Sequence, residues 1–267
     1  MEGTDLIVNR QDSENNKNVY INNFINFLQE CINNSEIETN ESNSIKNKSD
    51  NKQETFIKNL LINKYNFKEI KNENKTNKTN KTKKTKKTNK TNKTNKTIQY
   101  TEKEIMNMIK NPNLSFIEPG EFIHQPLGTQ KSPDFIIQVS KKCLIPFEAK
   151  SSHTYIPTYN SGGIKLNYIY MFTSKKINKT TIYLGSNIIN EIQTKLIKDY
   201  IEKCRVLDKE LNELLTNNDT NNRGVSYYTR PMIGQKGQND KTNYFTHNDK
   251  KICEDKVFDY LEKLKIE

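Results

Sequence analysis

Two acids and a lysine frame a short apolar part of this chain and could together bind a divalent metal ion and activate water. Asp134 precedes the apolar run 135–139, and Glu148, with Lys150 two positions later, follows the run 143–147. Carboxylate oxygens suit Mg²⁺, which keeps several waters and takes phosphate oxygens as further ligands. Such a metal lowers the pKa of a bound water, and a neighbouring lysine offsets charge on phosphorus. The residue types therefore indicate phosphodiester hydrolysis.

The elements that position these groups follow from the pattern. The polar Ser140-Lys141-Lys142 between the two runs has the length of a hairpin turn. If the chain folds back at about Lys141, Asp134 and Glu148 lie opposite each other, with Cβ atoms about 4.5–5.5 Å apart. Because strand side chains alternate, Lys150 shares the face of Glu148. The three groups then converge within one antiparallel hairpin.

Acid-x-Lys triplets are common in a lysine-rich chain, so the signal must be weighed against chance. Six occur here, and they begin at Asp50, Glu69, Glu73, Glu148, Asp249 and Glu254. Only the triplet at Glu148 ends an apolar run. The alternative is a surface hairpin in which Lys150 makes an ion pair worth about 0–1 kcal/mol. Two acids facing each other on one sheet face repel, however, unless they share a cation.

The segment Gln125–Phe135, followed by Phe147–Lys150, resembles the PD-(D/E)xK nuclease superfamily, and within it type II restriction endonucleases. The resemblance covers about residues 100–190. It implies an α/β or α+β fold in which a restriction-endonuclease-like mixed central sheet is flanked by helices. It also implies that Asp134 and Glu148 hold Mg²⁺ and that Lys150 is the catalytic lysine.

Many members of this superfamily add an acid from a helix that precedes the first core strand. Glu104 or Glu54 could serve here. Thr101 and Glu104, however, have the spacing of a capping box before an apolar helical face, which already accounts for Glu104. The sequence leaves open whether one or two metal ions act.

The resulting hypothesis is a Mg²⁺-dependent, site-specific endodeoxyribonuclease that cuts both strands of double-stranded DNA. Its functional partner would be a DNA methyltransferase of the same specificity, and a palindromic site would favour a twofold homodimer. One alternative is a structure-selective or repair nuclease of the same superfamily. Another is a DNA-binding module that has lost catalysis, against which the full set of Asp134, Glu148 and Lys150 argues.

Composition divides the 267 residues into three parts: a helical region, 1–70, with a disordered stretch at about 34–53; a disordered Lys/Thr/Asn repeat, 71–97; and the nuclease domain, 98–267. The net charge is +11, and ten lysines without an acid lie in the tract 74–97. Everything else therefore carries about +1. The repeat would bind DNA non-specifically, or it is a tolerated expansion in a surface loop.

Periodicity predicts the remaining elements. Helical faces occur at Phe24–Ile32 and from Phe56, and strands at 168–172 and 181–184. A long helix over about 187–215 carries one apolar stripe, which core packing explains most simply and a dimer contact explains otherwise.

DNA contacts should come from loops rich in hydrogen-bonding side chains, although ordinary polar loops have the same composition. One loop, 151–167, follows Lys150, and the other spans 227–244. The side chains singled out are Tyr159, Asn160, Lys165, Arg230, Gln235, Lys236 and Gln238.

Other classes of site and location have less support. His124, His153 and His247 lack the pattern of a histidine-metal nuclease, and the four cysteines have neither disulfide nor zinc-site spacing. No apolar stretch approaches the ~18–20 residues of a membrane helix. We therefore expect a soluble, cytoplasmic protein without a membrane segment.

Overall fold

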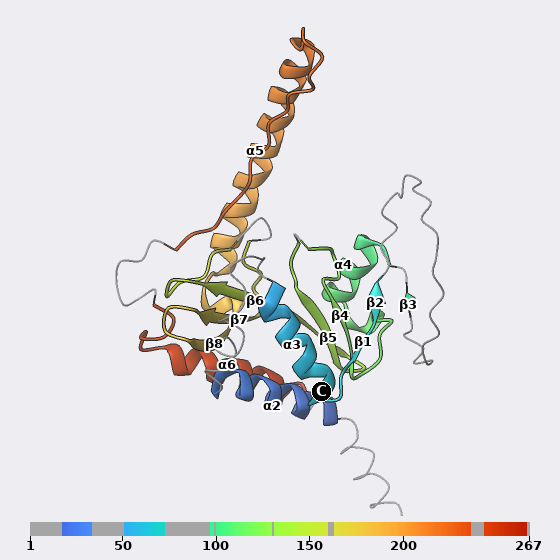
Figure 1. Cartoon of the computed structure of the whole chain (residues 1–267), viewed down its shortest axis with the longest axis vertical. Helices are drawn as coiled ribbons and strands as arrows, with labels where there is room; N and C mark the ends of the chain where they lie inside the picture. Colours follow the sequence, from blue (N-terminus) through green and yellow to red (C-terminus); the bar gives the residue numbers. More distant parts are fainter. Residues whose placement is uncertain are drawn as a thin grey trace, which may run out of the picture.

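The computed structural model describes residues 18–33, 51–72, 97–98, 100–129, 131–159, 163–235 and 243–265. Most of the two stretches predicted to be disordered, and the predicted DNA-contacting residues Asn160, Lys236 and Gln238, lie outside the described residues. The chain is a mixed α/β protein in which helices flank a six-stranded mixed sheet (Figure 1).

The central sheet has the strand order β1-β4-β5-β6-β7-β8. Its strands are β1 (Lys68–Glu69), β4 (Glu121–His124), β5 (Phe135–Ser140), β6 (Cys143–Ser152), β7 (Ile169–Ser174) and β8 (Lys179–Leu184). The pairs β1–β4 and β6–β7 are parallel and the other three are antiparallel. The short strands β2 (Lys71–Asn72) and β3 (Thr97–Ile98) form a separate parallel pair.

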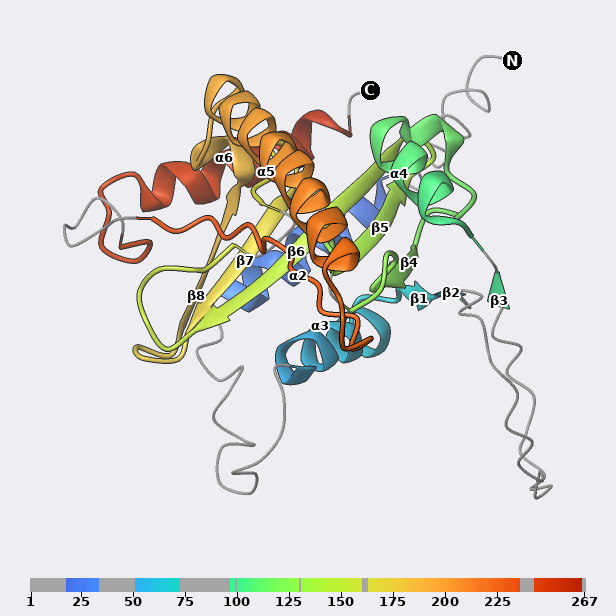
Figure 2. The same cartoon turned by 90° about the horizontal axis from the view of Figure 1, so that it is seen from above.

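Five α-helices accompany these strands in the described part of the chain. They are α2 (Val19–Asn33), α3 (Asn51–Asn63), α4 (Glu102–Lys110), α5 (Glu191–Asn217) and α6 (Lys250–Lys263), with single 3₁₀ turns η2 (Pro112–Leu114) and η3 (Gly185–Asn187). Seen from above, α2 passes behind the strands and α5 in front of them (Figure 2). Helix α4 packs on the face opposite to α2, so both faces of the sheet are covered, which explains why its strands are almost continuously apolar.

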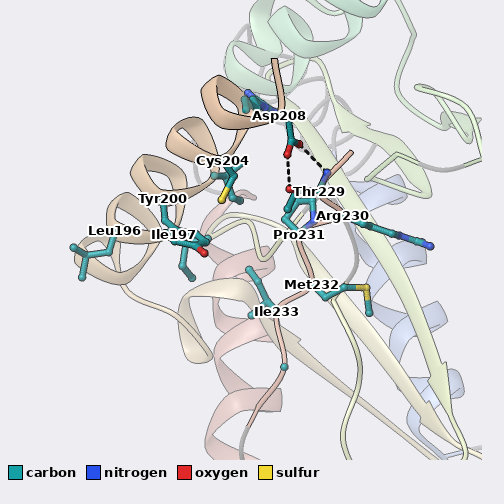
Figure 3. Close-up of a pocket in the computed structure, with 13 residues that line it drawn as sticks. Leu196, Ile197, Tyr200, Cys204, Asp208, Thr229, Arg230, Pro231, Met232 and Ile233 are labelled. Atoms are coloured by element: carbon teal, nitrogen blue, oxygen red, sulfur yellow. Dashed lines mark hydrogen bonds between the residues drawn. The ribbon is translucent and has the colours of Figure 1, made fainter. Parts of the chain in front are cut away.

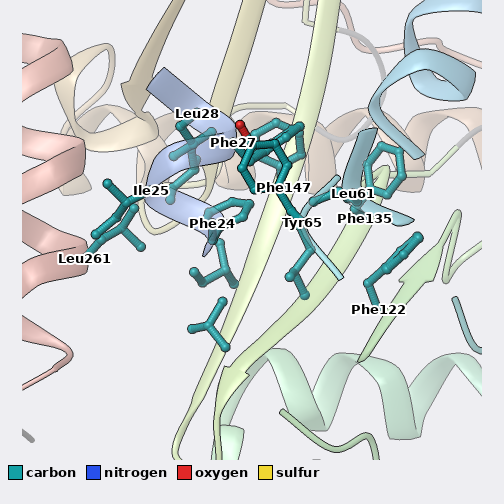
Figure 4. Close-up of a cluster of buried hydrophobic side chains, with 14 of the residues drawn as sticks. Phe24, Ile25, Phe27, Leu28, Leu61, Tyr65, Phe122, Phe135, Phe147 and Leu261 are labelled. Carbon is teal, nitrogen blue, oxygen red and sulfur yellow. The ribbon is translucent and has the colours of Figure 1, made fainter. Parts of the chain in front are cut away.

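The core on the α2 face is built from aromatic rings. Phe24 and Phe27 of α2 pack on Phe147 of β6, with ring centroids 5.9 and 6.0 Å apart (Figure 4). Side chains of α3 and α6, including Leu61 and Leu261, join the same cluster. Fully burying one such side chain contributes about 1.5–3 kcal/mol, so this cluster fixes β5 and β6 firmly against the helices.

The opposite face carries a second cluster. Ile105, Met108 and Ile109 of α4 pack there on strand residues that include Ile136 and Tyr170. Alternation along β5 and β6 sends Phe135 and Phe147 to the α2 face, so their neighbours Asp134 and Glu148 turn to the α4 face. The hairpin therefore carries its acids on one face and its aromatic anchors on the other.

Two sequence expectations need correction. None of the side chains of α5 is buried, so core packing does not explain its apolar stripe. Ile197 near its start packs on the second cluster, but the rest of the helix projects away from the sheet (Figure 1). The expected disorder up to residue 53 is also too long, because α3 begins at Asn51 and Gln53 is buried.

No helix among the described ranges is both long enough and apolar enough to cross a membrane.

Candidate active site

The β5–β6 hairpin turns at Lys141, as the sequence predicted. Phe135 pairs with Phe147, so Asp134 and Glu148 stand opposite each other at the next position. The only register shift between the two strands lies next to the turn, between Gln138 and Ser140. The end of the hairpin that carries the acids therefore keeps the expected pairing. The hairpin alone thus brings the two acids together.

Backbone hydrogen bonds hold each acid against the strand of the other. The Asp134 N–H donates to Glu148 Oε2 at 3.0 Å, and the Ala149 N–H donates to Asp134 Oδ2 at 2.8 Å. Lys150 Nζ donates to Glu148 Oε1 on the same strand. The middle residue of the acid-x-Lys triplet therefore fixes Asp134 through its backbone, while the two outer residues pair through their side chains.

Burial makes this pair of acids electrostatically unusual. Glu148 is only 4% exposed. Burial and the adjacent Glu148 charge raise the pKa of Asp134 to about 8, against the opposing influence of Lys150. At neutral pH the pair therefore retains a proton. Two negative charges here would exceed what Lys150 neutralises, and a bound cation could take the place of the retained proton.

Helix α3 reaches the same site from the α2 side of the sheet. The Gln53 side-chain amide donates to Thr173 Oγ1 at 2.9 Å and to the backbone oxygen of Lys150 at 3.4 Å. It thereby ties the start of α3 to the strand segment that carries the lysine. Gln53 was missed because it falls in a polar tract without apolar periodicity.

Glu54, one of the two acids proposed from the sequence, lies beside this cluster. His124 Nε2 and Gln125 Nε2 approach its Oε2 at 2.7 and 2.8 Å. Burial alone would raise the pKa of Glu54, but these hydrogen bonds lower it below its ordinary value. Its charge acts on both Asp134 and Lys150. Because α3 packs on the sheet face opposite to the acid pair, Glu54 influences Asp134 and Lys150 through its charge and is not placed with the acid pair as a third metal ligand.

Glu104 serves the helix in which it lies. Its Oε2 accepts from Thr101 N and Thr101 Oγ1, both at 2.7 Å, and its own N–H donates to Thr101 Oγ1. The predicted capping box is therefore confirmed. These bonds lower the pKa of Glu104, whose carboxylate is exposed to solvent.

The side chains proposed for DNA contact are placed differently from one another. Tyr159 is fully buried, and its hydroxyl lies 2.7 Å from that of Tyr183 and 3.0 Å from that of Tyr244. The structure therefore assigns it to the core and leaves no surface of it for a duplex. Gln235 Oε1 accepts from Tyr244 at 2.8 Å, and Arg230 extends away from α5 (Figure 3).

Among the residues proposed for DNA contact, Lys165 interacts electrostatically with the acid pair. Burial lowers its pKa and so does nearby Lys198 of α5, whereas the charge of Glu148 raises it. Tyr168 and Tyr170 are near enough to the Glu148 carboxylate for its charge to act on them. Burial and this charge together raise the pKa of each tyrosine. Lys198 was missed because its helix was interpreted as part of the core.

The donor set fits Mg²⁺ through two carboxylates. Among the described residues, no three Asp, Glu, His or Cys side chains are grouped to hold a metal ion. Asp134 Oδ1 accepts no hydrogen bond from the described residues, while Oδ2 is fixed by Ala149. Mg²⁺ is usually bound by one or two carboxylates and completes its shell with water and phosphate oxygens, so Asp134 and Glu148 would suffice.

Comparison of the chain with protein-family models, with curated proteins and with solved structures found no match.

Proposed function

We propose that this protein is a Mg²⁺-dependent endodeoxyribonuclease of the PD-(D/E)xK type, with Asp134, Glu148 and Lys150 as its active site. One observation carries the proposal: two opposed acids, buried Glu148 and half-buried Asp134, and a lysine are held together at the open end of one hairpin. Structural ion pairs are seldom built this way, because two facing carboxylates cannot both ionise at low cost unless a cation is shared between them.

The three side chains would have different roles in hydrolysis. Asp134 and Glu148 would hold the metal ion, which when bound supplies a more acidic water and neutralises charge at the phosphate. Lys150 donates to Glu148 in the free protein and would orient the attacking water or offset charge that develops on phosphorus. Lys165 and Lys198 add positive charge beside the acids, where the phosphates next to the cut would lie.

The finer proposal is a type II restriction endonuclease with a restriction-endonuclease-like fold, acting on double-stranded DNA beside a methyltransferase of the same specificity. Its support is the resemblance of Gln125–Phe135 and Phe147–Lys150 to that group, together with a mixed sheet flanked by helices.

The test is digestion of supercoiled and linear phage DNA by the full-length protein in Mg²⁺. Glu148→Gln removes one charge with little change of shape. Glu69→Gln is the matched control, because Glu69 also begins an acid-x-Lys triplet but pairs with Lys58 at 3.4 Å on β1. Far-ultraviolet circular dichroism would verify that both variants fold.

Discrete bands that disappear with Glu148→Gln and with chelator, but persist with Glu69→Gln, would support a site-specific enzyme. A smear with the same controls would keep the nuclease and refute the restriction proposal. Retarded but uncut DNA in every divalent metal would replace both with a DNA-binding module. Cleavage by Glu148→Gln at the normal rate would overturn the active-site assignment.

A further inference from the structure

Helix α5 is a projecting arm with an apolar face that nothing in the described chain covers. The helix is 27 residues long and has no buried side chain. Its most exposed apolar residues include Tyr200, at 68%, and Leu207, at 62%. Contiguous apolar surface of this extent is unusual on monomeric proteins and marks interaction sites.

The apolar residues form a row with the spacing of a helix-pairing seam. Tyr200, Leu207 and Leu214 recur every seven residues, and Leu196 and Leu211 flank them. A seven-residue apolar repeat keeps one stripe of a helix facing a second helix, with slight left-handed supercoiling. The spacing therefore indicates a helical partner.

The segment 225–233, here called the strap, covers a different side of the same helix. Asp208 accepts from Thr229 N and Oγ1, both at 2.7 Å (Figure 3). Asn212 also exchanges two 2.7 Å hydrogen bonds with the backbone of Tyr227. Between α5 and the end of the strap lies a groove of ≈ 710 Å³ that Tyr200 and Cys204 help to line. Leu196 and Tyr200 border this groove but remain 65% and 68% exposed, so the Tyr200–Leu214 row stays open to solvent.

We propose that the occupant of this row is α5 of a second copy of the chain, packed antiparallel about a twofold axis at Leu207. In that arrangement Leu207 meets its own copy, and Tyr200 faces Leu214 of the other chain. Lys203 comes next to Glu210, and the symmetry repeats that pair. A parallel pair would instead set Lys203 level with Lys203 and Glu210 level with Glu210.

Charge and area both fit this arrangement. Lys203 and Glu210 are exposed and make no ion pair with the described residues, whereas Arg205 and Lys209 of the same helix already pair with Glu202 and Glu213. The exposed apolar residues of the row, with Ile192, present on the order of 700 Å² per chain, close to the ~800 Å² per partner of a standard interface.

The test is the molar mass of the full-length protein, measured by sedimentation over a range of concentrations without DNA or metal. We expect a reversible dimer that Leu207→Glu weakens at least ~100-fold, because it buries a charge at the centre of the interface. Val206→Glu is the matched control: Val206 is 51% exposed on the neighbouring side of the same helix, and its variant should remain dimeric.

A charge exchange tests the direction of pairing. Lys203→Glu should weaken the dimer, and adding Glu210→Lys should restore it, because the antiparallel pair regains opposite charges. A monomeric wild-type protein at every concentration would overturn the proposal. Equal effects of Leu207→Glu and Val206→Glu, or no rescue by the double variant, would also overturn it.

The proposal does not depend on the proposed nuclease activity. Dimerisation without cleavage would remove only the function, and cleavage by a strict monomer would remove only the interface.

Discussion

Replacing Asp134 by asparagine should make the metal-free protein more stable than the wild type, even though it removes a proposed metal ligand. This difference in the free energy of unfolding should increase as the pH rises. The folded protein holds a proton on the Asp134–Glu148 pair up to about pH 8, whereas Asp134 in an unfolded chain releases its proton near the ordinary value of 3.8. Folding therefore takes up a proton between these two pH values, so this group makes the protein less stable as pH rises through the window.

The size of the effect follows from the same shift. One unit of pH within the window costs about 1.4 kcal/mol, so the wild-type protein should lose roughly 3 kcal/mol between pH 5 and pH 7 through this group. Asparagine cannot ionise, yet it keeps an oxygen for the Ala149 N–H, which lies 2.8 Å from Asp134 Oδ2. The free energy of unfolding of Asp134→Asn, relative to that of the wild type, should therefore increase by the same roughly 3 kcal/mol between pH 5 and pH 7.

Urea unfolding followed by circular dichroism in the presence of a chelator would measure this difference at several pH values. Titrating groups away from this site affect both proteins alike, so the difference between them reports on the Asp134–Glu148 pair. A difference that stays constant from pH 5 to pH 7 would refute the reasoning. Added Mg²⁺ should then stabilise the wild type more at pH 8 than at pH 6, because the cation competes with the retained proton, and should leave Asp134→Asn nearly unchanged.

Three further variants, the last with a matched control, test the site and its supports. Lys150→Met should lower the rate of DNA cleavage at least ~100-fold in a plasmid time course, run at a temperature where circular dichroism shows the variant folded because it also loses the ion pair with Glu148; an unaltered rate would contradict its catalytic role. Glu54→Gln should cost about 1–3 kcal/mol at neutral pH in urea unfolding. Because the folded pKa of Glu54 is lowered, this loss should fade in acid, and a loss that is independent of pH would be inconsistent with it. Gly185→Ala would put a Cβ 1.9 Å from the carbonyl oxygen of Lys165 and should destabilise by about 1–3 kcal/mol, whereas Gly234→Ala, with nothing within 4 Å, should change the melting temperature little.

Local pattern was enough to predict the hairpin and its acids. The side-chain period of a strand is two, and the turn length fixes the register, so the facing of Asp134 and Glu148 needed no contact from elsewhere in the chain. The capping box at Thr101 and Glu104 is equally local, because both partners lie within one helical turn.

Contacts between distant segments were not predictable in the same way. Strand β4 pairs with β5 although ten residues separate His124 from Phe135, and the four residues of β4 carry no clear alternation. Gln53 reaches Lys150 across 97 positions of sequence. Such pairings depend on how the layers stack, which no short window of sequence contains.

The apolar stripe of α5 shows the same division. Its seven-residue spacing is a property of the sequence, and it predicted a long amphipathic helix. Which surface that stripe meets is decided by where the helix lies in the folded chain. The structure directs it away from the sheet, so the stripe stays exposed.

The sequence by itself determined the chemistry available to this protein: two acids and a lysine within one hairpin, set by strand alternation and turn length. Only the tertiary structure decided their electrostatic state. Burial and the charge of the facing Glu148 raise the pKa of Asp134 to about 8, and the packing of α3 brings Glu54 near enough for its charge to raise that pKa further. Desolvation depends on every layer that excludes water, so it is a property of the whole fold.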